Sequence, residues 1–160
     1  MDIDEITALV AGLSGVVSLV PGAGSAAPEI AWGDTFFLYN PAGDEDGMKR
    51  QAFATIVTKD YPGWDESSQL DRPGMFRVNL AVGRSTFGEL LGYPPQQHAE
   101  HRDDIDYTVV DRLLPHPQYA SQGWVSVLNP GPATSELVGG LLLQAYALDV
   151  SRYQRRRSGS

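Results

Sequence analysis

The sequence predicts a single α+β domain in which a mostly antiparallel sheet carries N-terminal and C-terminal helices packed on it. Helical spacing of apolar residues occurs at both ends of the chain, with short β-branched segments and turn-rich loops between them rather than regular βαβ alternation. The 160 residues, 42% hydrophobic and 20% charged, can bury one core without a metal or disulfide. We expect residues 1–150 to form the domain and residues 151–160 to form a basic, flexible tail.

The first expected element is an amphipathic helix that begins after Asp2, which forms a capping-box pattern with Glu5. Its apolar positions recur at helical spacing: Ile3, Ile6, Leu9, Val10 and Leu13. Short strands are then expected at residues 15–20, 29–32, 35–39 and 53–58, the last two forming a hairpin around the acidic loop 40–50. Residues 21–28 are too rich in glycine and proline for regular structure.

A polar stretch at residues 59–74 is long for a plain connection, which favours a functional loop and makes it a candidate wall of a binding site. The strand expected at 75–82 alternates so that Arg77 and Asn79 share the face opposite its apolar residues. Thr86 then predicts a capped helix that ends near Gly92.

The C-terminal half is expected to contain a charged surface segment at 98–106, an apolar segment at 107–114 whose state periodicity leaves open, and a strand at 124–128. Thr134 predicts the cap of the last helix. We expect the buried stripe of that helix to comprise Leu137, Val138, Leu141, Leu142, Ala145 and Leu148.

Composition excludes several classes of function. The chain contains no cysteine, which removes disulfides, thiolate metal sites and cysteine nucleophiles and suits a reducing cytoplasm. A formal net charge of −8 argues against nucleic acid or an anionic membrane as a partner. The N-terminus is acidic rather than signal-like, and no apolar run approaches the roughly 20 residues that span a bilayer. We therefore expect a cytoplasmic protein of undetermined oligomeric state.

Four stretches resemble a bacterial family of small proteins of unknown function: residues 32–37 (WGDTFF), 53–60 (FATIVTKD), 70–74 (LDRPG) and 124–131 (WVSVLNPG). This resemblance covers nearly the whole chain and implies no activity. More distantly, two strands followed by a tryptophan strand and a final helix are similar to the MmcQ/YjbR-like proteins. That similarity implies a CyaY-like fold, with drug sequestration or self-protection as the role such a resemblance suggests.

One polar set could form a binding site if the strands around the loop 59–74 pair. Its members are Lys59, Asp60, Arg72, Arg77 and Asn79. Guanidinium and ammonium groups beside one carboxylate suit the carboxylate or phosphate of a small ligand. The alternative is an ion-pair network that ties the loop to the sheet, and the sequence leaves both readings open.

Aromatic and imidazole side chains supply the other candidates. Trp64 lies in a polar loop and is expected to contact ligand, whereas Trp124 is expected in the core. His116 lies between two prolines with Tyr119 close behind, which suits either acid-base chemistry or a rigid turn.

Two weaker patterns remain. His98 and His101 lie beside three aspartates, but a solvated face is favoured over a metal site, and neither a metal nor a cofactor is expected. The serine, histidine and aspartate residues lack a G-x-S-x-G elbow, which disfavours a hydrolase triad.

The sequence thus favours a small-molecule-binding protein whose site includes Lys59, Trp64, Arg72, Arg77, Asn79 and Tyr119. One alternative is a cofactor-independent enzyme in which His116 or Asp60 is the general acid or base. The other alternative is a protein-interaction module.

Overall fold

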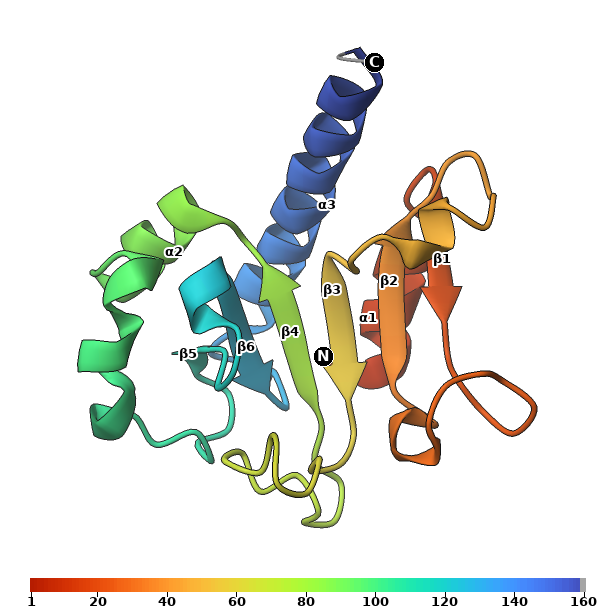
Figure 1. Cartoon of the computed structure of the whole chain (residues 1–160). Helices are drawn as coiled ribbons and strands as arrows, with labels where there is room; N and C mark the ends of the chain where they lie inside the picture. The colour runs from red at the N-terminus through yellow and green to blue at the C-terminus, as the bar shows by residue number, and fades with distance from the viewer. Residues whose placement is uncertain (159–160) are drawn as a thin grey trace.

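The computed structural model describes residues 1–158 and is built around one six-stranded sheet in the order β1-β2-β3-β4-β6-β5 (Figure 1). Every neighbouring pair of these strands is antiparallel. The strands are β1 Val16–Leu19, β2 Thr35–Tyr39, β3 Ala54–Val57, β4 Arg77–Ala81, β5 Leu113–Pro115 and β6 Trp124–Leu128. The predicted α+β class and antiparallel sheet are confirmed, as is the pairing of 35–39 with 53–58.

Within residues 1–158, three α-helices and five short 3-10 helices complete the fold. The α-helices are α1 Ile3–Ala11, α2 Arg84–Leu91 and α3 Ser135–Ser158. The 3-10 helices are η1 Glu29–Ala31, η2 Gly47–Lys49, η3 Pro95–Glu100, η4 Arg102–Asp104 and η5 Ala120–Gln122. None of the helices within residues 1–158 combines the length and the apolar character needed to cross a bilayer.

The core lies between one face of the sheet and the helices α1 and α3, which lie behind the sheet in Figure 1. Strand alternation directs Phe37, Ile56 and Val78 to this face, where all three are fully buried. The buried residues of the two helices complete it: Ile6, Val10, Val138, Leu141, Leu142 and Ala145. As predicted, Asp2 and Glu5 form the capping box of α1. The opposite face of the sheet faces the viewer and is covered by loops rather than by α1 or α3.

Three details of the predicted elements are wrong. Residues 29–31 form η1 instead of a strand, because β1 pairs directly with β2 and leaves no sheet edge for a strand between them. The helix α2 begins after Gly83, whose φ of 87° makes the turn, so Thr86 lies inside the helix and caps nothing. In the predicted buried stripe of α3, Leu137 is 37% exposed and Leu148 is only partly buried, so the stripe comprises Val138, Leu141, Leu142 and Ala145.

The predicted tail also differs, because α3 continues through residues 151–158. Tyr153 packs edge-on against Tyr39 with 5.3 Å between ring centroids, and the Arg50 guanidinium lies 5.0 Å from the Tyr153 ring. The helix therefore packs on the domain beyond the predicted boundary at residue 150. Residues 159–160 lie outside the described residues, and the flexibility of this segment stays a prediction.

Candidate functional site

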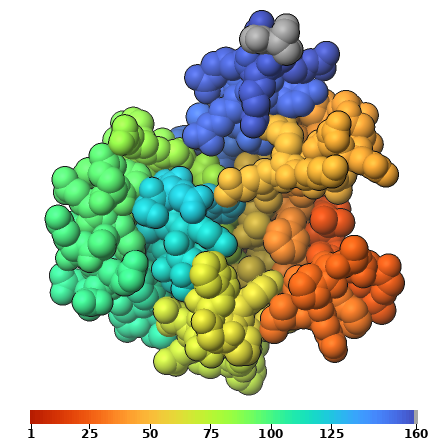
Figure 2. Space-filling view, viewed as in Figure 1, coloured from red at the N-terminus to blue at the C-terminus, as the bar shows by residue number. Residues whose placement is uncertain are grey.

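The loop-covered face of the sheet carries a polar row at its centre. Thr55 pairs with Asn79 across β3 and β4, and Asn79 pairs with Ser126 across β4 and β6. Residues of the loop 59–74 and of the segment 116–123 border this row. Figure 2 shows the face hollowed between the yellow loop, the cyan segment and the orange part of the chain.

A pocket of about 370 Å³ occupies this hollow. Its floor includes Thr55, Val57, Arg77 and Asn79 of β3 and β4. Its walls are largely aromatic, with Phe36, Trp64, Tyr119 and Trp124 as the main contributors. The volume falls within the range of about 300–1,000 Å³ that is typical of small-molecule sites.

One wall is a continuous group of rings from three separate segments. The Trp64 and Tyr119 rings lie 6.2 Å apart, the Tyr119 and His116 rings 4.9 Å, and the His116 and Trp124 rings 6.1 Å. Trp64 is 54% exposed, so this indole is available at the mouth of the pocket. The side-chain amide of Gln118 donates to the Trp64 carbonyl and joins the two loops that carry the wall.

The sequence places Trp64 and Tyr119 in a site, and both line this pocket. It misses Phe36 and assigns Trp124 to the core. Trp124 is only 5% exposed, but it also borders the pocket. The sequence misses this position of Trp124 because it depends on the pairing register of the strands. Trp124 pairs with Ala81 and so lies on the same face of the sheet as the polar row, which the pattern of one strand does not show.

Arg77 lies in the floor of the pocket, but its guanidinium is committed to protein groups. Its Nη1 and Nη2 donate to Asp65 Oδ1 and Oδ2 at 3.1 and 2.6 Å, and Nη1 also donates to Ser68 Oγ at 2.8 Å. Its Nε donates to Asn79 Oδ1 at 2.8 Å, and Asn79 Nδ2 donates to Thr55 Oγ1 at 2.9 Å. This is the ion-pair network between loop and sheet that the sequence left open as an alternative.

Lys59 belongs to a second network, centred on the fully buried Asp34. Its ammonium donates to the Trp32 carbonyl at 2.6 Å and to Asp34 Oδ1 at 3.2 Å. The Tyr61 hydroxyl donates to the other Asp34 oxygen, and burial, followed by this hydrogen bond, raises the pKa of Tyr61 above its ordinary value. Lys59 therefore holds the loop and does not line the pocket.

Asp60 and Arg72 also stabilise the loop 59–74 and do not line the pocket. Asp60 Oδ1 accepts the Leu70 backbone N–H at 2.8 Å. Arg72 donates to the carbonyls of Ser68, Gln69 and Thr108. Lys59, Asp60 and Arg72 thus bind backbone groups and the buried Asp34 carboxylate instead of converging on one point, as the sequence-based hypothesis of a cationic site required.

His116 borders the pocket and is 3% exposed. Its Nδ1 accepts the backbone N–H groups of Gln118 and Tyr119 at 2.9 and 3.0 Å, so the ring fixes the turn that follows β5. Burial, with a smaller contribution from the positive charge of Arg77, lowers the pKa of His116 well below its usual value. The structure thus shows the rigid turn that the sequence offered as one alternative, and the imidazole also borders the pocket, whereas its acid-base role stays a prediction.

The His98 and His101 side chains lie among aromatic neighbours. His98 is buried, with its two ring nitrogens paired to the Tyr93 and Tyr107 hydroxyls at 3.0 and 3.2 Å. His101 stacks on the Tyr93 ring at 3.8 Å. Within residues 1–158, no three metal-binding side chains gather closely enough to hold an ion. The expectation that His98 lies on a solvated face is wrong, because aromatic neighbours enclose the ring.

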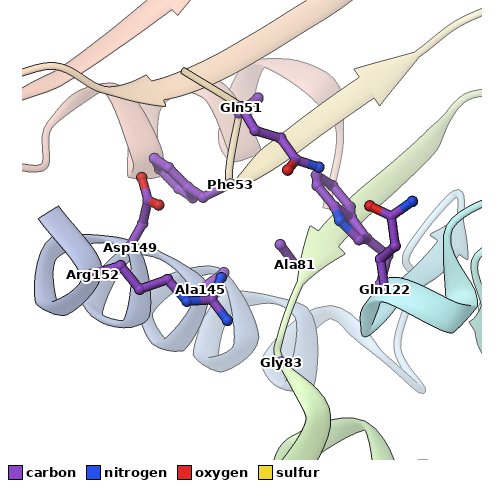
Figure 3. Close-up of a pocket in the computed structure, with 10 residues that line it drawn as sticks. Gln51, Phe53, Ala81, Gly83, Gln122, Ala145, Asp149 and Arg152 are labelled. Atoms are coloured by element: carbon purple, nitrogen blue, oxygen red, sulfur yellow. The ribbon is translucent and has the colours of Figure 1, made fainter. Parts of the chain in front are cut away.

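A second, smaller cavity of about 70 Å³ lies beyond Trp124 (Figure 3). Asp149 and Arg152 of α3 face Gln51 and Phe53 across it. Asp149 forms an ion pair with Arg50 at 3.3 Å, and burial raises its pKa. The cavity is small for an organic ligand, so the larger pocket is the candidate site.

Comparisons with known proteins identify a family whose function is unknown. The model of a family described as "Family of unknown function (DUF6194)" matches residues 1–158. No curated protein matches the chain. The chain is similar to the crystal structure of Deinococcus radiodurans protein DR2400, family-model domain DUF419, at 18% sequence identity and a TM-score of 0.48, over 91% of this chain and 76% of that chain.

Proposed function

We propose that this chain, which belongs to the DUF6194 family of unknown function, is a small-molecule-binding protein. The observation that carries the proposal is the aromatic pocket of about 370 Å³ on the loop-covered face of the sheet. The face of an antiparallel sheet that lies opposite the core is commonly polar and open to solvent, so large aromatic rings are not expected there without a contact. Here Trp64 lies at the edge of an accessible hollow with half its surface exposed, which supports a ligand as the missing contact.

Binding without chemistry is favoured over catalysis by the state of the candidate acid-base groups. His116 uses Nδ1 as a double acceptor of backbone hydrogen bonds, so it cannot take a proton there without losing them. Asp60 accepts the Leu70 N–H and lies outside the pocket lining. A pocket with an ordered aromatic wall and no free base suits sequestration or presentation of a metabolite or natural product.

The surroundings of the pocket also bear on the expected partners. The formal charge of −8 supports the expectation that nucleic acid is not the ligand, because a phosphate backbone is repelled at long range. The basic residues Arg152, Arg155, Arg156 and Arg157 lie on the last turns of α3, away from the pocket lining. A cytoplasmic location and a small-molecule partner remain part of the proposal.

The proposal is tested by a thermal-shift screen of metabolites, nucleotides and natural-product antibiotics, because specific ligands raise the apparent stability of the native state. We expect hits that Trp64→Ala weakens and that Leu143→Ala, an exposed apolar truncation on α3, leaves unchanged. Mass spectrometry of the released hit should show the compound intact. Conversion of the compound would favour the enzyme hypothesis, and equal loss in both variants would remove the pocket as the site.

A further inference from the structure

We propose that the pocket selects neutral molecules that combine an aromatic face with a hydrogen-bond acceptor, and that the Nε2–H group of His116 recognises that acceptor. This inference rests on the proposed function, because it names the chemistry of the ligand for the same pocket. It replaces the anionic ligand that the arginine and lysine residues of the sequence favoured.

The hydrogen bonds around His116 fix its tautomer. Two backbone N–H groups, from Gln118 and Tyr119, point at Nδ1 within 3.0 Å, so this nitrogen presents its lone pair and carries no proton. A neutral imidazole must then carry its proton on Nε2. A proton added to Nδ1 would point at the two backbone N–H groups that already donate to this nitrogen. That repulsion keeps the ring neutral in the folded state.

The Nε2–H group is free to serve a ligand. No residue within 1–158 forms a hydrogen bond with Nε2, although the side chain is almost fully buried and borders the pocket. Nε2 is not sealed by protein, because the fully buried side-chain atoms without a partner among the described residues are Ser126 Oγ and Asp149 Oδ2, so a ligand acceptor can reach this donor from the pocket. Because Nδ1 is held from behind, the donor is aimed before the ligand arrives.

A second donor lies on the floor of the pocket. Thr55 Oγ1 accepts a hydrogen bond from Asn79 Nδ2, and no other hydrogen bond joins Thr55 Oγ1 to a residue within 1–158. The hydroxyl proton of Thr55 is therefore available to a ligand. Both polar groups thus offer protons, which favours ligands that present carbonyl or ring-nitrogen acceptors.

The charges in the lining cancel. Asp65 and Arg77 are the formally charged pair, and they bind each other through two hydrogen bonds. Tyr61 keeps its proton, since burial and the bond to Asp34 raise its pKa. A carboxylate or phosphate in the pocket would lose hydration without gaining a free cation. The aromatic wall instead favours a ring system that stacks on Trp64 and Tyr119.

Three two-ring probes separate these features. Coumarin is neutral and has a carbonyl acceptor, coumarin-3-carboxylate adds a negative charge, and naphthalene has neither acceptor nor charge. Each probe is titrated into ¹⁵N-labelled protein, with the indole N–H signals of Trp64 and Trp124 as reporters. We expect coumarin to bind most tightly, by several-fold over naphthalene, and the carboxylate to bind most weakly.

Two substitutions test the role of His116. In His116→Asn, Oδ1 replaces Nδ1 as the backbone acceptor and the Nε2–H donor is lost, whereas His116→Gln keeps a donor near Nε2 and loses the Nδ1 acceptor. We expect His116→Asn to weaken coumarin on the order of tenfold, the value of one buried hydrogen bond, and to leave naphthalene unchanged. The comparison of probes on the unmodified chain needs no variant, so it stands even if both substitutions prevent folding.

The outcomes distinguish this inference from the proposed function. Tightest binding of the carboxylate, equal binding of naphthalene and coumarin, or unchanged coumarin affinity in a folded His116→Asn protein would overturn the inference and leave a binding pocket. If none of the three probes shifts the Trp64 or Trp124 signal up to its solubility limit, the inference is overturned, whereas the proposed function is overturned only if the wider thermal-shift screen also yields no compound whose binding Trp64→Ala weakens.

Discussion

Breaking the ion pair between Asp65 and Arg77 by removing one partner should destabilise this chain strongly. The Arg77 side chain is 1% exposed and the Asp65 side chain 10%, and two hydrogen bonds of 3.1 and 2.6 Å join them. Removing one partner leaves the other charge buried without compensation, which costs about 3–5 kcal/mol. Since a domain of this size loses about 2–4 °C per kcal/mol, Asp65→Asn should lower Tm by about 6–20 °C.

A double-mutant cycle separates the pair from its surroundings. Asp65→Asn, Arg77→Met and the double variant are unfolded in urea with fluorescence as the signal. The double variant should be more stable than the sum of the single losses predicts, by about 1–3 kcal/mol, because it leaves no uncompensated charge.

The matched control is the surface pair of Asp46 and Lys49, whose side chains are 95% and 79% exposed. Asp46→Asn should change the free energy of unfolding by less than about 1 kcal/mol. If the stability losses of the two single variants are additive, or if Asp65→Asn costs as little as the control, the structural role of the pair is refuted. Arg77 would then again be a candidate ligand-binding residue.

Three further outcomes follow from the hydrogen bonds. Thr134 and neighbouring backbone N–H groups lower the pKa of Asp111 from 3.8 to about 2, so the stability that Asp111 adds is full above pH 3.8 and is lost as the pH falls through 2. Asp111→Asn should therefore be less stable at neutral pH, and its deficit should shrink over that window in acid-unfolding curves. His116 has a lowered pKa, so the stability it contributes is present above its unfolded value of 6.5 and is lost at lower pH. His116→Asn should flatten the stability profile below pH 6.5, and a parallel profile would contradict the neutral ring. Asp2→Ala should cost about 1 kcal/mol in urea unfolding through loss of the cap, whereas Asp4→Ala, in the same turn, should cost less.

Local sequence rules succeeded where short-range chemistry decides the structure. The Asp2 and Glu5 pattern predicted the cap of α1, because a capping box involves only the first turn of a helix. The alternation at 75–82 placed Arg77 and Asn79 on one face, because neighbouring side chains of a strand point in opposite directions. The strand predicted at residues 29–32 was wrong, because so short an apolar pattern fits either a strand or a helical turn. Only the availability of a neighbouring strand decides between the two.

The candidate site was predicted less completely, for a physical reason. The charged residues Lys59, Asp60 and Arg72 were predicted to bind a small anionic ligand. Their partners are instead the buried Asp34 carboxylate and backbone groups, which no spacing in the sequence identifies. Phe36 and Trp124 reached the pocket only through the strand register. Trp64 and Tyr119 were found because large rings in polar loops are conspicuous in any sequence.

The amino-acid sequence by itself determined the α+β class, the terminal helices, most strands, and the absence of cysteine chemistry. Those properties depend on composition and on periodicities of a few residues. Only the tertiary structure decided that Arg77 is neutralised by Asp65 and that Nδ1 of His116 accepts two backbone N–H groups. Both features depend on which polar groups lie next to each other in the folded chain, and the order of residues does not specify this. Burial strengthens each of these hydrogen bonds and makes a missing partner costly.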